Sequence, residues 1–216
     1  ILLGLTILTA SISWNFQGPM MGLISGIGVA AAMISAIATF GLWIFSWIIK
    51  PTPHRAPYTA PIYAAGMGFA IGLISQQFES LFPGIVIQAV SLTFFVAASL
   101  LLLYKTGVIR PDQNFLLIMA CATLGIFFTY IANIFYAMAT GSSFSIITDT
   151  GLMGIGFSLF VVVIAALNLV LDFDIIEQAA ETRAPKYMEW FGAMALVMTL
   201  IWLYLEILRL LAKLRS

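Results

Sequence analysis

Long apolar stretches separated by short polar breaks organise this chain of 216 residues. The breaks are rich in Gly, Pro or polar residues, as in "KPTPHRAPYTAP" and "QQFESLFPG". About 20 apolar residues in a helix cross a bilayer, so the pattern predicts seven transmembrane helices in a single domain of residues 1–216. The predicted helices cover residues 1–14, 19–49, 61–78, 85–104, 115–138, 151–171 and 187–208.

An all-α polytopic membrane bundle is the fold class that this pattern predicts. Backbone groups in hydrocarbon must be satisfied internally, and no segment alternates as a barrel strand does. The first segment starts apolar without a methionine, so we expect it to be truncated, and the long second segment should tilt or project. Paired small residues, Gly22 with Gly26 and Gly68 with Gly72, predict close helix packing.

The composition supports a membrane protein and excludes several functional classes. Hydrophobic residues make up 62% of the chain and charged residues 8%, so lipid must be part of the solvent. Nine basic residues balance nine acidic ones, which gives no nucleic-acid footprint. One cysteine, Cys121, and one histidine, His54, can build neither a disulfide nor a structural zinc site. No nucleophile–base pair can be placed, so we expect neither an enzyme nor a resident cofactor.

Lysine and arginine orient the predicted helices. The loops after the second, fourth and sixth segments carry six basic residues and the opposite loops carry none, which predicts that these three loops and the N-terminus are cytoplasmic. The six are Lys50, Arg55, Lys105, Arg110, Arg183 and Lys186. A conflicting basic tail follows the seventh segment, with Arg209, Lys213 and Arg215. Either that helix crosses despite its tail, or it re-enters and returns.

Four carboxylates cluster in "NLVLDFDIIEQAAE", residues 168–181, where the sixth segment ends. Asp174, Glu177 and Glu181 are three and four residues apart, so they share a helix face and suit a solvated helix end. Asp172 lies about 200° from Asp174, at about 100° per residue, and shares its face with Asn168 one turn deeper. Asp172 is therefore the member of the cluster that can face the bundle interior.

A further acid, Glu206, follows a long apolar run in the seventh segment. A local ion pair with Arg209, three residues later, is one interpretation. The alternative is contact with Asp172, where two carboxylates would compete for one proton and form a proton-sensitive latch. Their oxygens would also suit a hard cation such as Ca²⁺.

Helix geometry opposes direct contact between these two acids. If the hairpin turns near residues 183–186, Asp172 lies about eleven residues before the turn and Glu206 about twenty after it. At about 1.5 Å per residue the depth mismatch is roughly 13 Å, which tilt or an extended start of the last helix would have to remove. Glu189 matches Asp172 better in depth, although it lies among aromatic residues typical of an interface.

Three motifs make the chain resemble the Bax inhibitor-1/YccA family: "LYLEILRLL" near the C-terminus, "DFD" at the end of the sixth segment and "PGIVIQAVSLTF" in the fourth. The acidic run together with "APKYMEW" is most similar to the bacterial branch. The resemblance covers essentially the whole chain and is most specific in its last third. It implies six helices around a central seventh.

The resemblance also implies a function, a pH-sensitive passive Ca²⁺ leak gated by an acidic pair between helices six and seven. The matching residues are Asp172, with Asp174 as the register-shifted choice, and Glu206, which replaces a common aspartate. One departure is Met67, which stands where relatives often have an acid. A thioether does not coordinate Ca²⁺ usefully, so this position has lost a possible ligand.

The alternative function is a non-conducting regulator in the bacterial cytoplasmic membrane. Some bacterial relatives modulate a membrane-bound AAA protease, and the missing acid at Met67 favours such a role. The partners expected from sequence are therefore the lipid bilayer and, in this alternative, another membrane protein.

Overall fold

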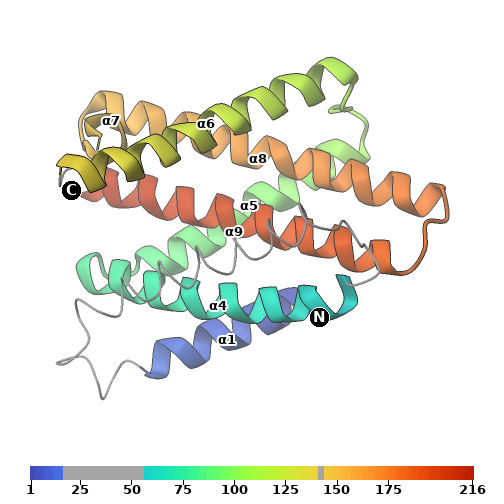
Figure 1. Cartoon of the computed structure of the whole chain (residues 1–216), viewed down its shortest axis with the longest axis horizontal. Coiled ribbons are helices and arrows are strands. Elements are labelled where there is room, and N and C mark those ends of the chain that lie inside the picture. Colours follow the sequence, from blue (N-terminus) through green and yellow to red (C-terminus); the bar gives the residue numbers. More distant parts are fainter. Residues whose placement is uncertain (17–55, 141–143) are drawn as a thin grey trace. The chain divides into compact units, whose positions relative to one another are not determined.

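The computed structural model, drawn in Figure 1, describes residues 1–16, 56–140 and 144–216. Every regular element in these ranges is a helix. The helices are α1 (Leu2–Phe16), α4 (Ala56–Leu81), α5 (Ile85–Lys105), α6 (Gln113–Thr140), α7 (Ser145–Thr148), α8 (Leu152–Glu181) and α9 (Tyr187–Arg215). Of these described helices, α4, α5, α6, α8 and α9 are long and apolar enough to cross a membrane, and α1 is a shorter apolar helix. The predicted all-α polytopic membrane bundle is confirmed.

The helices extend beyond the apolar segments at several ends. α5 differs from its predicted range by a single residue, whereas α8 continues through the acidic run to Glu181 and α9 continues through the basic tail to Arg215. Glu, Gln, Lys and Arg are good helix formers, so a loss of hydropathy need not end a helix. The predicted helix at 19–49 lies outside the described residues.

Two carboxylates cap helix starts. Glu79 accepts hydrogen bonds from the amides of Gly84 (2.6 Å) and Val86 (3.1 Å), across the turn that leads into α5. Asp112 Oδ1 accepts one from the amide of Phe115 (2.7 Å) at the start of α6. Both acids satisfy amides that have no partner within the helix, and their charge opposes the positive end of the helix dipole.

Two compact units make up the chain, one of Ile1–Val86 with Gln178–Val197 and one of Ile87–Glu177 with Met198–Ser216. In the first unit α1 packs along α4 (Figure 1). A Cβ atom built on Gly68 would lie 2.4 Å from the carbonyl oxygen of Thr6, and one on Gly72 would lie 2.5 Å from that of Ala10. The close packing predicted for Gly68 and Gly72 is confirmed, while Gly22 and Gly26 lie outside the described residues.

The second unit has its apolar core between α6 and α8. Met119 and Ile126 of α6 pack there with Val161 and Ile164 of α8. The outward side chains are also apolar, as expected where lipid is the solvent, and include Phe95, Leu102, Leu117 and Phe128.

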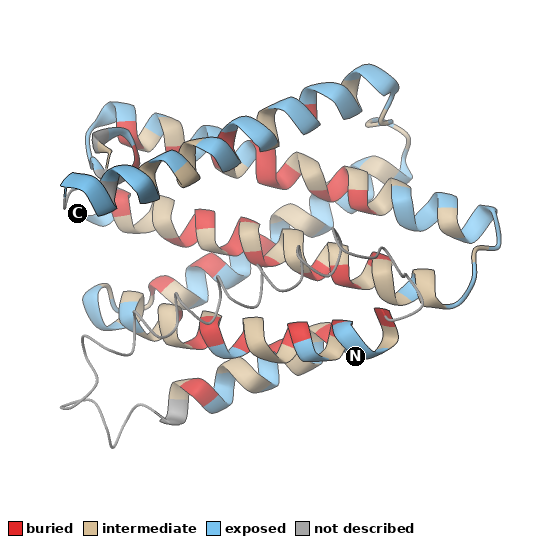
Figure 2. Ribbon diagram, in the orientation of Figure 1, coloured by how far each residue is buried: buried red, intermediate tan, exposed pale blue. Residues whose placement is uncertain are grey.

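Buried residues recur along α9, whereas α5 and α6 have few (Figure 2). From Trp190 to Lys213 every residue of α9 is buried or partly buried. No residue of α9 is exposed over this length, and the central position expected for the last helix stays a prediction.

Candidate functional site

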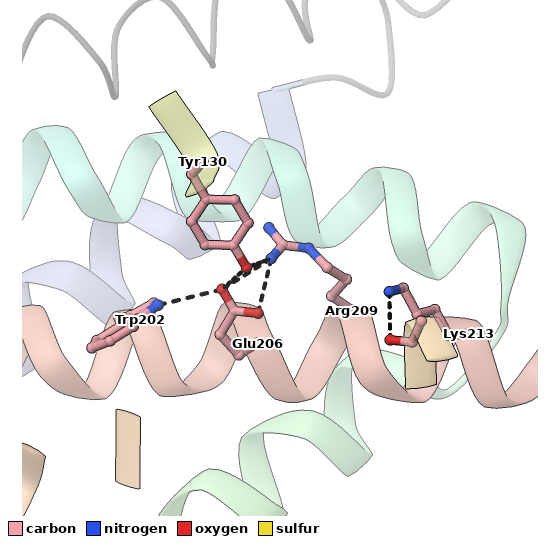
Figure 3. A network of polar contacts seen from close by, with 6 residues as sticks. Tyr130, Trp202, Glu206, Arg209 and Lys213 are labelled. Atoms are coloured by element: carbon pink, nitrogen blue, oxygen red, sulfur yellow. Dashed lines mark hydrogen bonds and ion pairs between the residues drawn. The ribbon is translucent and has the colours of Figure 1, made fainter. Parts of the chain in front are cut away.

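A polar network surrounds Glu206 in α9 (Figure 3). The side chain of Glu206 is 3% exposed. Nη1 of Arg209 donates hydrogen bonds to Oε1 (2.9 Å) and Oε2 (2.8 Å) of this carboxylate. Oε1 also accepts from the hydroxyl of Tyr130 in α6 (2.9 Å) and from the indole nitrogen of Trp202 (3.3 Å). Both oxygens of this buried acid therefore have hydrogen-bond partners, which offsets the cost of keeping a carboxylate away from water.

Helix periodicity places most of this network. Trp202, Glu206 and Arg209 are four and three residues apart in α9, so they lie on one face. Tyr130 reaches that face from α6, within the same unit. Its hydroxyl accepts a hydrogen bond from Nη1 of Arg209 (2.5 Å) while donating to Glu206. The local ion pair that the spacing of Glu206 and Arg209 offered is present.

Asp172 of α8 is the second buried acid of this unit, with 9% of its surface exposed. The side chain of Thr199 in α9 hydrogen-bonds to its carboxylate. Within the described part of the chain, Oδ2 of Asp172 is buried and has no hydrogen-bond partner. Asp172 therefore faces α9 and not lipid, and one of its oxygens can still accept a proton or a cation.

Asp172 and Glu206 have separate partners. Thr199 lies seven residues before Glu206, which corresponds to two helical turns and about 10 Å along α9. This separation has the same direction and a similar size as the depth mismatch predicted from helix geometry. The contact between the two acids remains a prediction about another arrangement of α8 and α9.

The other acids of the 168–181 cluster lie nearer the surface. The hydroxyl of Tyr104 in α5 donates hydrogen bonds to Asp174 (3.3 Å) and to Glu177. Glu181 is exposed, as is Glu189 in α9. These acids are exposed or partly exposed, as is typical of charged residues at the end of a membrane helix.

Asn168 links α8 to α6. Its amide nitrogen donates hydrogen bonds to the hydroxyl of Thr123 (3.0 Å) and to the carbonyl oxygen of Ile164 (2.8 Å). Asn168 therefore serves an interhelical contact one turn from Asp172.

The basic tail of α9 has partners inside the second unit. Nζ of Lys213 donates a hydrogen bond to the carbonyl oxygen of Gly154 in α8 (2.9 Å), and Arg215 donates one to the side-chain oxygen of Gln88 in α5 (2.7 Å). Lys213 is 8% exposed. The re-entrant alternative needs a break in this segment, and α9 is continuous from Tyr187 to Arg215.

The passage of an ion does not require a preformed metal site. The described residues contain no group of three or more His, Cys, Asp or Glu side chains that could hold a metal ion. Because Ca²⁺ takes six to eight oxygen ligands, Asp172 and Glu206 would need carbonyl or water oxygens to complete a shell.

Comparison with known families identifies the chain. The model of a family described as Bax inhibitor 1 like matches residues 1–216. The chain belongs to this family. No curated protein and no solved structure is significantly similar to it. The resemblance read from the sequence is confirmed at the family level, and the placement in the bacterial branch stays a prediction.

Three site residues of this Bax inhibitor 1 like protein were missed by sequence reasoning: Tyr130, Trp202 and Thr199. Trp202 could have been found, because it lies one turn before Glu206. The spacing of Thr199 from Glu206 also puts it on that face. Tyr130 gave no signal, because only the packing of α6 against α9 selects it from the seven tyrosines of the chain.

Proposed function

We propose that this Bax inhibitor 1 like protein is a pH-sensitive passive cation leak, and that the acids Asp172 and Glu206 regulate it. In this proposal Asp172 binds and releases the regulating proton. Glu206 supplies the second carboxylate, on the helix that Asp172 faces. We further propose that the protein works in the bacterial cytoplasmic membrane.

The observation that supports this function is the buried, unpartnered oxygen of Asp172. A carboxylate inside a membrane helix bundle is costly and normally has a partner or a task. Thr199 occupies only part of its hydrogen-bonding capacity. A buried oxygen without a partner can take a proton when the solution becomes acidic, and protonation removes the charge that attracts a cation.

Ca²⁺ flux into liposomes that contain the purified protein tests the proposal. Asn has the shape of a protonated Asp and no charge, so the leak of Asp172→Asn should no longer change between pH 6 and pH 8. It should stay at the level that the unmodified protein reaches at the acidic end. A wild-type leak that is absent, or a variant that keeps the full pH response, would remove the proposal.

Coupling between the two acids needs a double variant. If Asp172 and Glu206 share one proton in some state, the effect of Asp172→Asn with Glu206→Gln should be smaller than the sum of the single effects. Glu189→Gln, which changes an exposed acid of α9, serves as the control and should leave the pH response intact. Additive single effects would show that the acids act independently.

A second candidate function is a non-conducting regulator of another membrane protein, such as a membrane-bound AAA protease. Two features favour it: Met67 replaces a possible cation ligand in α4, and the charge of Glu206 is neutralised by Arg209. Crosslinking in native membranes followed by purification would recover the partner. A protein that recovers no partner and conducts cations when reconstituted alone would exclude this function.

A further inference from the structure

One nitrogen of Arg209 lies where three oxygens converge. Nη1 is within 2.9 Å of Oε1 and Oε2 of Glu206 and of the hydroxyl oxygen of Tyr130. Figure 3 shows the guanidinium beside the tyrosine hydroxyl and the carboxylate, with dashed lines from one of its nitrogens to both. A positive group surrounded by a bidentate carboxylate and a hydroxyl has the oxygen environment that a free cation would seek.

The position of Glu206 and Arg209 along α9 places their ion pair near the middle of the helix. Ile201 is the middle residue of α9, so Glu206 lies about 7.5 Å from the midpoint of the helix, well within the hydrocarbon depth. Arg209 belongs to the same helix, three residues later, and its side chain is 36% exposed whereas that of Glu206 is 3% exposed. Of the two side chains, the arginine is therefore the more exposed and the acid the more deeply buried.

We propose that Arg209 is a tethered cation that fills a cation seat formed by Glu206 and Tyr130, and that it blocks this seat to free cations. This inference deepens the proposed leak, because it names the group that a permeating ion must displace. The binding part of the inference does not require that the protein conducts.

Lys213 strengthens the block. It lies one turn beyond Arg209 in α9 and is held by the carbonyl oxygen of Gly154. Like charges four residues apart on a helix repel one another, so movement of the guanidinium toward Lys213 is disfavoured. Glu206, Arg209 and Lys213 together carry one net positive charge, which opposes the approach of a free cation. Removal of the guanidinium makes this cluster neutral.

The simpler alternative is that Arg209 only neutralises a buried acid. In that case its loss leaves Glu206 uncompensated, and the protein is destabilised or Glu206 takes up a proton. Neither outcome creates a seat that a free cation enters. The two interpretations therefore differ in whether an added guanidinium ion binds in place of the missing side chain.

Arg209→Ala tests the seat by a binding measurement. Trp202 donates to the same carboxylate oxygen, so its fluorescence should report whether the seat is filled. Adding guanidinium at neutral pH should shift the tryptophan emission of Arg209→Ala. Millimolar concentrations are needed, because the covalent link of the arginine side chain holds its guanidinium at an effective concentration of that order. The shift should be absent in the unmodified protein and in Arg209→Ala with Glu206→Gln. Repeating the titration with Trp202→Phe identifies Trp202 as the source.

A flux measurement tests the block. The Ca²⁺ leak of Arg209→Ala in liposomes should be faster than wild type by roughly tenfold or more, because a single charge-assisted hydrogen bond is worth about that factor and Arg209 makes several. Guanidinium should slow it again. Arg215→Ala, at an exposed position of the same helix, is the control and should leak at the wild-type rate.

The outcomes separate the two proposals. A guanidinium-dependent emission shift without any leak in any variant supports the seat and removes the proposed function. A wild-type leak that Arg209→Ala leaves unchanged, with no emission shift, overturns the seat and keeps the leak. If Arg209→Ala does not fold, Arg209→Gln is uncharged but retains hydrogen-bond donors, and it is judged by the same two measurements.

Discussion

At the scale of single residues, one tyrosine hydroxyl connects the charged groups around Glu206. Tyr130 donates to the acid and accepts from Arg209, so it joins both members of the ion pair to a second helix. In an environment without water, each of these groups would otherwise lack a partner for part of its hydrogen-bonding capacity. The hydroxyl thus contributes to stability and also fixes the position of the guanidinium.

Tyr130→Phe should therefore destabilise the protein. Loss of a hydroxyl that bonds two charged groups should cost about 1–3 kcal/mol, because the groups are left underbonded in a nearly dry site. Thermal denaturation in detergent would show the loss as a lower midpoint.

Tyr136→Phe is the matched control on the same helix. The ring of Tyr136 stacks on Phe144 and is 40% exposed, and phenylalanine preserves this stacking. Its stability should change by less than about 0.5 kcal/mol. Equal effects of the two substitutions would contradict the role assigned to the Tyr130 hydroxyl.

At the scale of elements, α1 and α4 show how helices associate where lipid removes most of the hydrophobic driving force. Gly68 and Gly72 are one turn apart and bring the backbone of α4 against the carbonyl oxygens of α1. Close approach of this kind lets van der Waals contacts hold two helices together in lipid. The glycines thus determine how closely the two helices pack.

Gly72→Ala should separate α1 from α4. The added Cβ would lie 2.5 Å from the carbonyl oxygen of Ala10, a backbone atom that cannot rotate away. Overpacking of this size should cost about 1–3 kcal/mol of stability, visible in thermal denaturation. Gly4→Ala in α1 is the control, because its new Cβ would meet nothing within 4 Å. A variant at Gly72 as stable as the one at Gly4 would show that close contact is not required.

At the scale of the whole molecule, the orientation in the membrane is the main property that remains a prediction. The positive residues favour cytoplasmic positions for the loop after α5 and the loop after α8. The basic tail that conflicted with this assignment has intramolecular partners for Arg209, Lys213 and Arg215. These contacts lie within the second unit and are compatible with either side of the membrane.

Cysteine labelling in intact cells can test this orientation. In a protein whose Cys121 is replaced by serine, cysteines at Thr106 and Thr182 should resist a membrane-impermeant maleimide from outside. Cysteines at Ser80 and Thr150 should react with it. All four positions are exposed in the structure, so access depends on the side of the membrane. The reverse pattern would invert the topology, and a mixed pattern would contradict alternating spans.

The amino-acid sequence alone determined the fold class, the family and most helix positions. Hydrophobic length fixes which segments can cross a bilayer, and the need to satisfy backbone groups in hydrocarbon leaves helices as the solution. The sequence also identified Asp172 and Glu206 as acids within apolar segments, where a carboxylate normally needs a partner. Local spacing was sufficient for the Glu206–Arg209 ion pair, because residues three apart on a helix are neighbours.

Only the tertiary structure decided which groups meet across helices. Sequence periodicity gives the face of each helix but neither the depth at which two helices align nor the neighbour that completes a site. Tyr130 next to Glu206, Thr199 next to Asp172 and the carbonyl oxygen of Gly154 next to Lys213 all depend on that alignment. In lipid, apolar surfaces alone do little to choose a register, so close packing and a few polar contacts set it.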